Sequence, residues 1–388
     1  MKNNREYNHE FTSSEFYDEL TNSLNSYYAK VNGKVATFRC DSEIYSLSLI
    51  EQFVKKIINS KKIGFIKNVE ILKDRILKVT YSQTELGIYF KSINAFISVI
   101  RRYEEFYILS EYVNLFQDSS NKLILPTVIF RNPNDFIYKI EKYEADLYNE
   151  LIESIRANSK AKEFKKIVSN RKTNSVRQQK SALKYIDTLF TQHLRLLVLR
   201  IDLGYLVNIN TSSDTPGQNV TLEQANKDFK RFKNNWRHNR LFENLVGNIW
   251  KLEFSECKGY HYHLILFFRE LDVCNDACIS DLIGKYWKQN ITDNHGTFHN
   301  CNAQKKKYFH LGDGLIDATA DVELRANLNN VAIYLTMNEQ FLKAKLGKND
   351  KSYGSGVVPK KEPMTMTLPK PINQRTAEDQ YSNATKAE

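Results

Sequence analysis

The chain of 388 residues lacks the sequence features that are typical of secreted proteins, membrane-spanning proteins and nucleotide-binding enzymes. Five scattered cysteines are too few for a disulfide framework at this length, which favours a reducing environment. No stretch of about 18 uncharged apolar residues occurs, so no segment is expected to cross a bilayer. The first residues, MKNNREYNHEF, lack the apolar core of a secretory signal, and no GxxxxGK[ST] phosphate-binding loop occurs. We therefore expect a cytoplasmic protein that needs no nucleotide.

Glycine and proline are also scarce, at 14 and 7 residues, whereas tyrosine and phenylalanine reach 22 each. Hydrophobic residues make up 41% and charged residues 26%, the balance of a globular chain with a real core. Basic residues outnumber acidic residues, with 56 Lys and Arg against 45 Asp and Glu, which gives a net charge of +11. This charge favours a polyanionic partner, with nucleic acid first and an anionic membrane second, although it can also serve solubility alone.

The N-terminal part, residues 1–155, carries no recognisable chemical motif and is expected to be a mostly helical domain of unknown role. Apolar residues recur at helical spacing in three of its segments, and β-rich runs occur in three others. The predicted helices are 42–60, 87–117 and 135–157, and the β-rich runs lie near 62–66, 76–82 and 123–130. Pro126 is expected to break the last of these runs or to confine it to a sheet edge.

A basic segment at 156–190 is predicted to be a helical linker. Lysine and arginine recur from Arg156 to Lys184, and Glu163 is the acidic exception there. Such a run can grip phosphates or can be a solvated helix face, and the sequence leaves both readings open. We expect a second domain at 191–353 and a disordered polar tail at 354–388.

The stretch 249–268, IWKLEFSECKGYHYHLILFF, organises the second domain. Two runs of aromatic and branched residues flank a short polar break, which predicts a β-hairpin. Because strand side chains alternate between faces, His261 and His263 project from one face. If the loop is symmetric about Cys257, Glu253 lies directly opposite His261 on that face. Two imidazoles and one carboxylate would then form a three-ligand divalent metal site with open positions.

A second strand is expected over 196–203, in the run LRLLVLRIDL. Leucine and isoleucine at odd positions face one side, which puts Arg200 and Asp202 on the other side. An arginine and an aspartate inside a strand are costly unless they meet charge. Asp202 could assist the metal or order a ligand, and Arg200 could meet a phosphate. Alternatively, this end of the strand simply reaches solvent.

A helix over 221–240 interleaves basic and aromatic residues, a pattern that suits single-stranded nucleic acid. Thr221 and Gln224 fit a capping box at its start. Arg237 and Arg240 near its end are candidate phosphate-binding residues. The aromatic residues are better explained as the buried stripe of this helix.

Cysteine and histidine residues form a looser set after the hairpin. Their spacing matches no common zinc pattern, so a structural zinc site is not favoured. They are Cys274, Cys278, His295, His299, Cys301 and His310.

Taken in order, these motifs resemble a known family. The sequence HYH at 261–263 resembles the His-hydrophobic-His (HUH) motif of single-strand DNA endonucleases. Its wider neighbourhood, from about 195 to 358, is similar to the inovirus-type replication proteins, also known as YagK/YfjJ-like proteins of prophages. The matching segments are LLVLRIDLGY at 196–205, GNIWKLEFSECKGYHYHLILFF at 247–268, KYW at 285–287, YLTMNEQ at 334–340 and YGSG at 353–356.

The resemblance implies an α+β fold with an HUH-like domain, in which helices cover a central antiparallel β-sheet with 196–203 and 260–268 in its middle. The covering helices would include 221–240 and 321–346. The implied function is a rolling-circle replication initiator of a phage-like or prophage element, which nicks and rejoins single-stranded DNA at a replication origin. Tyr334 would be the nucleophile and would form a 5′-phosphotyrosyl intermediate. The implied metal is Mn²⁺ or Mg²⁺, and host replication machinery could be a further partner.

One position departs from the family pattern. A lysine usually follows the nucleophile by three or four residues, but Met337 stands there, and Lys343 or Lys345 would be spaced differently. Two alternatives to this function stay open, and Met337 supports the first of them. The chain could be a non-enzymatic DNA-binding protein with a degenerate HUH fold, or a metal hydrolase that acts without Tyr334.

Overall fold

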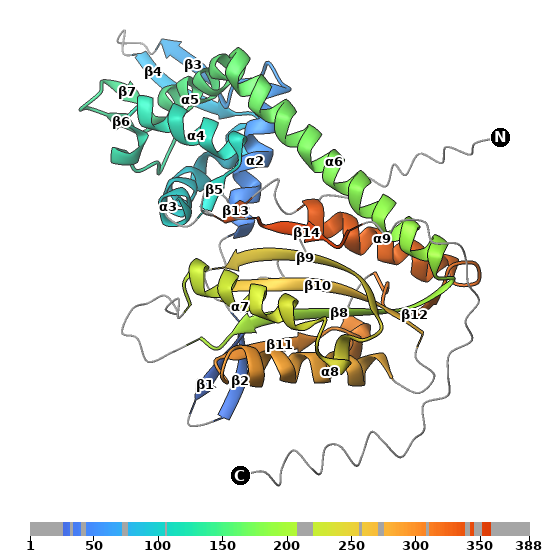
Figure 1. Cartoon of the computed structure of the whole chain (residues 1–388). Helices are drawn as coiled ribbons and strands as arrows, with labels where there is room; N and C mark the ends of the chain where they lie inside the picture. The colour runs from blue at the N-terminus through green and yellow to red at the C-terminus, as the bar shows by residue number, and fades with distance from the viewer. Residues whose placement is uncertain are drawn as a thin grey trace, which may run out of the picture.

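The computed structural model describes residues 26–31, 34–39, 44–71, 77–104, 107–207, 220–255, 258–270, 275–307, 310–337, 342–344 and 351–357. Helices and antiparallel sheet are mixed in this part of the chain, which agrees with the expected α+β class. A helical N-terminal part and a sheet-based C-terminal part are joined by the long helix α6 (Lys162–Gln192), which runs along both (Figure 1). None of the described helices combines the length and the hydropathy needed to span a membrane.

Phe53 lies at the centre of the N-terminal part, where its ring packs against Tyr89, Phe96, Phe116 and Tyr148. Apolar residues at helical spacing bury one face of each surrounding helix. The helices are α2 (Ile44–Ile58), η1 (Gly87–Ser92), α3 (Ile93–Tyr103), α4 (Glu111–Lys122), η2 (Leu125–Thr127) and α5 (Glu144–Asn158).

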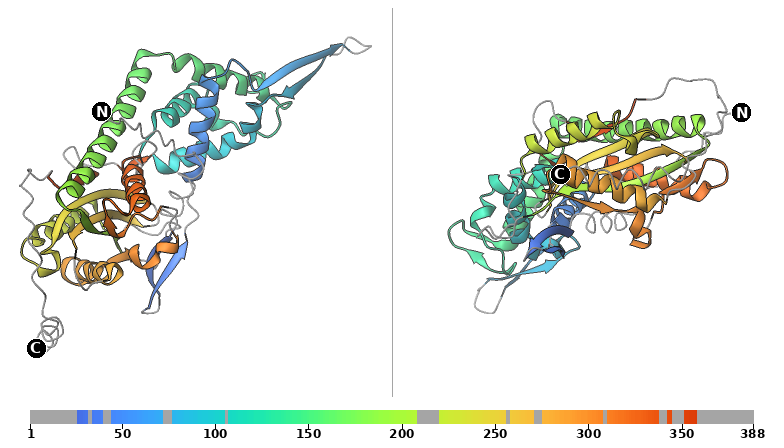
Figure 2. Two further views of the ribbon diagram at one scale, coloured as in Figure 1. Left: turned by 90° about the vertical axis from the view of Figure 1, so that its right-hand side faces the viewer. Right: turned by 60° about the horizontal axis from the view of Figure 1, so that its bottom comes forward.

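Three short antiparallel hairpins belong to the same half of the sequence. The hairpin formed by β3 and β4 projects away from the helices (Figure 2). The hairpins are β1 (Ser26–Val31) with β2 (Lys34–Arg39), β3 (Phe65–Ile71) with β4 (Leu77–Gln83), and β6 (Phe136–Ile137) with β7 (Lys142–Tyr143).

Two local predictions for this part are wrong. The expected single helix over 87–117 is broken by the short strand β5 (Tyr107–Leu109), after which the Ser110 hydroxyl accepts a hydrogen bond from the Val113 N–H and starts α4. The helix expected from 135 starts only at α5, because β6 and β7 come first. In the β-rich run at 123–130, by contrast, Pro126 breaks the strand as expected: it lies in η2, and Ile124 precedes this turn with a left-handed φ of 58°.

A six-stranded antiparallel sheet forms the C-terminal part within the described residues. The predicted strands at 196–203 and 260–268 occupy its middle as β8 and β10, and their continuous apolar runs fit strands covered on both faces. The order is β11 (Gly296–Asn300), β8 (Arg195–Tyr205), β10 (Gly259–Arg269), β9 (Leu245–Ser255) and β14 (Tyr353–Ser355), with β12 (Gly314–Asp317) also paired to β8.

One face of the sheet packs against α7 (Leu222–Asn235), η3 (Arg240–Phe242), α8 (Asp276–Tyr286) and the π-helical turn Trp287–Ile291. Half of the predicted capping box is present, because the Thr221 hydroxyl accepts a hydrogen bond from the Gln224 N–H at 3.2 Å. The Gln224 side chain instead donates to Asp228 Oδ1 at 2.7 Å. The preceding polar loop, at 208–219, lies outside the described residues.

The second face carries α9 (Val322–Met337) and the C-terminal half of α6, which lie side by side (Figure 1). Helix α9 is shorter than the expected helix over 321–346, since the strand β13 (Leu342–Ala344) pairs with β5 of the N-terminal part. A single hydrophobic cluster joins this face of the sheet, α6, α9 and the N-terminal helices. The short helix η5 (Asn302–Lys307) lies beside β8.

Candidate metal centre

The hairpin of β9 and β10 has the register predicted from the sequence. Ser255 pairs with Gly259, so the hairpin is symmetric about position 257, and His261 pairs with Glu253. Residues Ile265 and Phe267, which follow the histidines at period two, belong to the cluster that includes α6 and α9. The histidines therefore project from that face of the sheet, which we call the metal face.

The side chains of Glu253, His261 and His263 converge, with ligand atoms that all lie within 4.8 Å of one another. Glu253 Oε2 is 3.2 Å from His263 Nε2 and 3.8 Å from His261 Nε2. The three residues are 8%, 2% and 4% exposed. Two nitrogen donors and one carboxylate, all buried, make a suitable partial coordination sphere for a divalent cation.

Hydrogen bonds orient both imidazoles. His261 Nδ1 lies 3.1 Å from the Gly259 carbonyl oxygen, which can only accept, so Nδ1 carries the proton and Nε2 presents a lone pair. His263 Nδ1 lies 2.6 Å from Asp202 Oδ1. A carboxylate or carbonyl behind a ligand histidine is the arrangement that fixes the ring in metal sites. Both Nε2 atoms consequently point towards the same carboxylate oxygen.

The protonation state and hydrogen bonding of His261 show whether a cation fits between its ring and Glu253. Burial, followed by the positive charge of Lys258, lowers the pKa of His261 to about 3, so the ring is neutral at pH 7. Its Nε2 is buried and makes no hydrogen bond with the described residues. A lone pair held beside a buried carboxylate is unfavourable. A cation between the two would satisfy both.

His263 behaves in the opposite way. Burial lowers the pKa of His263, but the charges of Asp202 and Glu253 outweigh burial and raise it to about 9. Burial raises the pKa values of Asp202 and Glu253. The positive charge of His263 and its hydrogen bonds lower them by more, so both pKa values lie well below their ordinary range. In the ion-free protein, a proton on His263 therefore balances two carboxylates.

Further polar residues flank the three ligands, and the sequence analysis missed two of them. Lys251 pairs with His263 in the strand register and is 3% exposed. On the other side of His263 stand Asp202 and then His299, which is opposite Asp202 in β11. Lys258, at the hairpin turn, contributes positive charge near Asp202 and Glu253. The period-two rule that selected Glu253 also places Lys251 on the metal face.

Tyr334 lies on α9 and is 2% exposed. It belongs to the same hydrophobic cluster as Ile265 and Phe267, so α9 carries it on the metal face of the sheet. Its ring packs in the hydrophobic core on that face. This packing is equally consistent with a purely structural role for the tyrosine.

The candidate phosphate-binding arginines are divided between the two faces. Arg200, at an even position of β8 like Asp202, is on the metal face, and its backbone N–H donates to Asn302 Oδ1 at 2.7 Å. Arg237 and Arg240 are exposed and follow α7, whose buried side chains pack on the opposite face. The structure therefore does not bring these two arginines together with the metal ligands.

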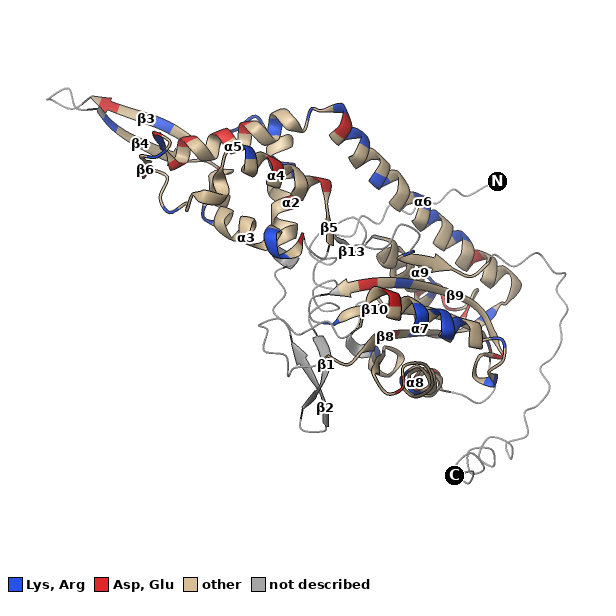
Figure 3. Cartoon of the chain, turned by 60° about the vertical axis from the view of Figure 1, so that its left-hand side comes forward, with Lys and Arg blue, Asp and Glu red and all other residues tan. Residues whose placement is uncertain are grey.

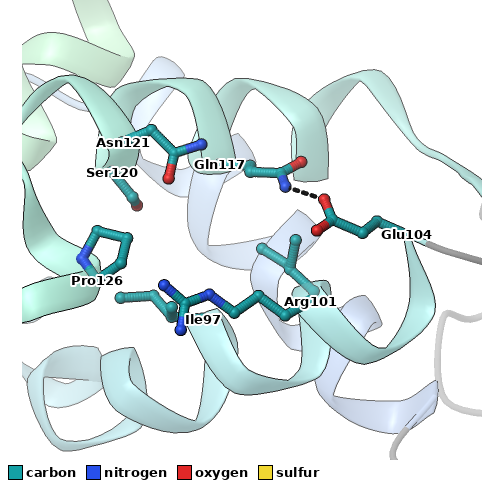
Figure 4. Close-up of a pocket in the computed structure, with 8 residues that line it drawn as sticks. Ile97, Arg101, Glu104, Gln117, Ser120, Asn121 and Pro126 are labelled. Carbon is teal, nitrogen blue, oxygen red and sulfur yellow. Dashed lines mark hydrogen bonds between the residues drawn. The ribbon is translucent and has the colours of Figure 1, made fainter.

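No second cluster of metal ligands occurs in the part of the chain that the structure describes. His295, His299, Cys301 and His310 do not gather into a zinc site, and Cys274 lies outside the described residues. A surface pocket between α3 and α4, where Gln117 donates a hydrogen bond to Glu104, lies in the N-terminal part and contains no candidate site residue (Figure 4).

Comparison with known proteins relates the chain to a family. A family model described as the YagK/YfjJ C-terminal domain matches residues 157–355, and the family is associated with prophages. No curated protein and no solved structure matches the chain. The matched region covers more than half of the sequence and contains α6, the central strands, the three ligands and α9. The chain therefore belongs to the YagK/YfjJ C-terminal domain family.

Proposed function

We propose that this protein is an HUH-type endonuclease that nicks and rejoins single-stranded DNA and initiates rolling-circle replication of a prophage or filamentous-phage-like element. The observation that carries the proposal is the convergence of His261 Nε2, His263 Nε2 and the Glu253 carboxylate on one face of the sheet. The tyrosine of α9 is on that same face. Membership of a prophage-associated family and the net charge of +11 support a DNA substrate.

The bound cation, Mn²⁺ or Mg²⁺, would act as a Lewis acid on an oxygen of the scissile phosphate. Asp202 and the Gly259 carbonyl hold the two imidazoles in place. The positive charges of Lys251 and Lys258 would help to neutralise the phosphate.

The proposed reaction is a transesterification. The Tyr334 oxygen forms a bond to phosphorus while the bond from phosphorus to the 3′ oxygen breaks. The phenol proton ends on that 3′ oxygen, which leaves a 3′ hydroxyl and a 5′-phosphotyrosyl enzyme. Because the covalent link keeps the energy of the phosphodiester, the reverse reaction rejoins the strand without a nucleotide.

Access to the site is part of the proposal. The three ligands and Tyr334 are each less than 10% exposed. In the proposed enzyme, a DNA strand would reach them only after the segments packed on the metal face move apart.

The test is incubation of the full chain with end-labelled single-stranded DNA and Mn²⁺, followed by a denaturing gel and peptide mapping. We expect a cleaved strand and a covalent adduct on Tyr334. His263→Ala should abolish nicking and leave most DNA binding, and Tyr334→Phe should abolish the adduct. Nicking that survives His263→Ala would show that the metal assignment is wrong, and equal nicking by Tyr334→Phe would favour a hydrolase without a tyrosyl intermediate.

The second candidate is a non-enzymatic DNA-binding protein that retains the fold. The burial of Tyr334 and the presence of Met337, where the resemblance implies a lysine, favour it. Salt-sensitive DNA binding with no adduct under any divalent metal would be its signature.

A further inference from the structure

Lysine and arginine residues recur along α6 (Figure 3), and seven of them fall on one side of the helix. All of them are exposed, and we call them the α6 stripe. They are Lys162, Lys165, Lys166, Lys172, Arg177, Lys180 and Lys184.

The stripe lies on the exposed side of α6. At 3.6 residues per turn these positions fall within an arc of about 140°, and at 1.5 Å per residue they span about 33 Å. Tyr185 and Leu189, on the opposite side of α6, are buried against the sheet. The ion pairs of α6 with other described elements involve Arg171 with Glu111 and Asp187 with Arg325, so they leave the charge of the stripe available.

The charge and the lack of exposed aromatic residues in the stripe indicate which ligand it would bind. Such a row of cations with almost no acid among them complements a polyanion with regularly spaced charges. The aromatic residues of α6 face inward, since Phe164 packs on Tyr112, and Tyr185 and Phe190 are buried. The stripe therefore offers no surface on which unpaired bases could stack, as single-strand binding would require. Its length matches one turn of duplex DNA, about 34 Å.

We propose that the α6 stripe binds the phosphate backbone of double-stranded DNA. Contacts with the sheet fix the position of α6. The Tyr185 hydroxyl accepts a hydrogen bond from the Asn248 N–H at 3.1 Å, and Leu189 lies against Gly247. Both contacts are to β9, the strand that carries Glu253. A duplex on the stripe is therefore held in a fixed relation to the metal centre.

This proposal goes beyond the nicking reaction, because it concerns a different surface and a different form of DNA. It is tested without metal. The full chain and a variant with Lys165, Lys166, Lys172 and Lys180 changed to Gln are titrated with a fluorescent 30-base-pair duplex in EDTA over a range of salt concentrations. Glutamine keeps the helix propensity of lysine, so circular dichroism and the melting temperature should stay unchanged.

The slope of log K against log salt should fall by about 0.9 for each phosphate that the variant no longer neutralises, so we expect a fall of about 2 or more. The matched control changes Lys61, Lys91, Lys139 and Lys285, which are also exposed but lie outside α6. An equal fall in the control would show an effect of net charge alone and would overturn the proposal.

Two further arms separate the remaining outcomes. The same two proteins are titrated with a single-stranded oligonucleotide and with anionic vesicles. The proposal would also be overturned if the stripe variant lost more affinity for the single strand than for the duplex, or lost affinity for the vesicles alone. Nicking of a short single strand by the stripe variant should stay at the wild-type level. This result separates a failure of the duplex site from a failure of the proposed nuclease.

Discussion

Asp202 orients one imidazole of the candidate metal centre, because its carboxylate oxygen Oδ1 lies 2.6 Å from His263 Nδ1. Carboxylates in this position typically contribute a factor of about 10 to 100 in metal affinity. We therefore expect Asp202→Asn to weaken Mn²⁺ binding by that factor, as measured by isothermal titration calorimetry. Arg237→Gln, on the opposite side of the sheet, is the control and should bind Mn²⁺ as the wild type does. Unchanged affinity in Asp202→Asn would show that the ring of His263 needs no such support.

The protonation of His263 makes metal binding depend on pH. Its pKa of about 9 lies above the ordinary value of 6.5, so an ion must displace its proton at neutral pH. Glu253 and Asp202 are already ionised because their pKa values are lowered, and they release none. Affinity should rise with pH up to about 9, with about one proton released per ion at pH 7, as calorimetry in buffers of different ionisation enthalpy would show. Binding that is independent of pH would contradict the assigned ligands.

The same pKa also affects folding without an ion. The folded pKa of His263 is raised, so its contribution to stability is fully present below pH 6.5 and is lost as the pH rises to about 9.

Sequence reasoning finds the cluster of candidate ligands because its geometry follows local rules. The alternation of strand side chains and the symmetry of one loop place Glu253, His261 and His263 together. It misses Lys251, although the same rule puts that residue on the metal face, because a lysine usually indicates a solvent-facing position. The burial of Lys251 depends on the segments packed over the sheet, and no local pattern encodes them.

Among the elements, long apolar runs are the easiest to predict and interrupted helices the hardest. Strands β8 and β10 are predicted with nearly correct bounds because their side chains are buried on both faces. The helical spacing over 87–117 continues across β5, so periodicity alone cannot reveal the break. Nor does the sequence tell which face of the sheet α7 covers, and for this reason it cannot separate Arg237 and Arg240 from the metal ligands.

The contact between α6 and β9 depends on Gly247. A Cβ atom at this position would lie 2.5 Å from Leu189 Cδ1 and 2.9 Å from the Tyr185 hydroxyl. We expect Gly247→Val to force the helix and strand apart and to lower the free energy of unfolding in urea by about 1–3 kcal/mol. Gly204→Ala is the control, because a Cβ there meets its neighbours at 3.4 Å or more. Equal stability of the two variants would show that α6 is not tightly packed on the sheet.

On the scale of the whole molecule, the two parts share one hydrophobic core. The cluster runs from Phe53 in α2 through Tyr185 in α6 to Phe267 in β10. The Tyr107 hydroxyl, in β5, also donates to the Phe254 carbonyl of β9 at 2.7 Å. Burial across such a boundary should make both parts unfold together.

Trp236, Trp250 and Trp287 all belong to the C-terminal part, so tryptophan fluorescence reports on that part alone. Far-UV circular dichroism reports on the helices of both parts. We expect the two signals to change with the same midpoint in a urea titration. Separate midpoints would show that the shared core does not couple the two parts.

The central claim is that Glu253, His261 and His263 hold one divalent cation. The most direct test is a titration of the full chain with Mn²⁺ followed by electron paramagnetic resonance, which distinguishes free from bound ion. We predict one bound Mn²⁺ per chain, lost in His261→Ala and in His263→Ala variants that circular dichroism shows to be folded, and retained in Cys301→Ser. No bound Mn²⁺ at millimolar concentration, or equal binding by the histidine variants, would contradict the account.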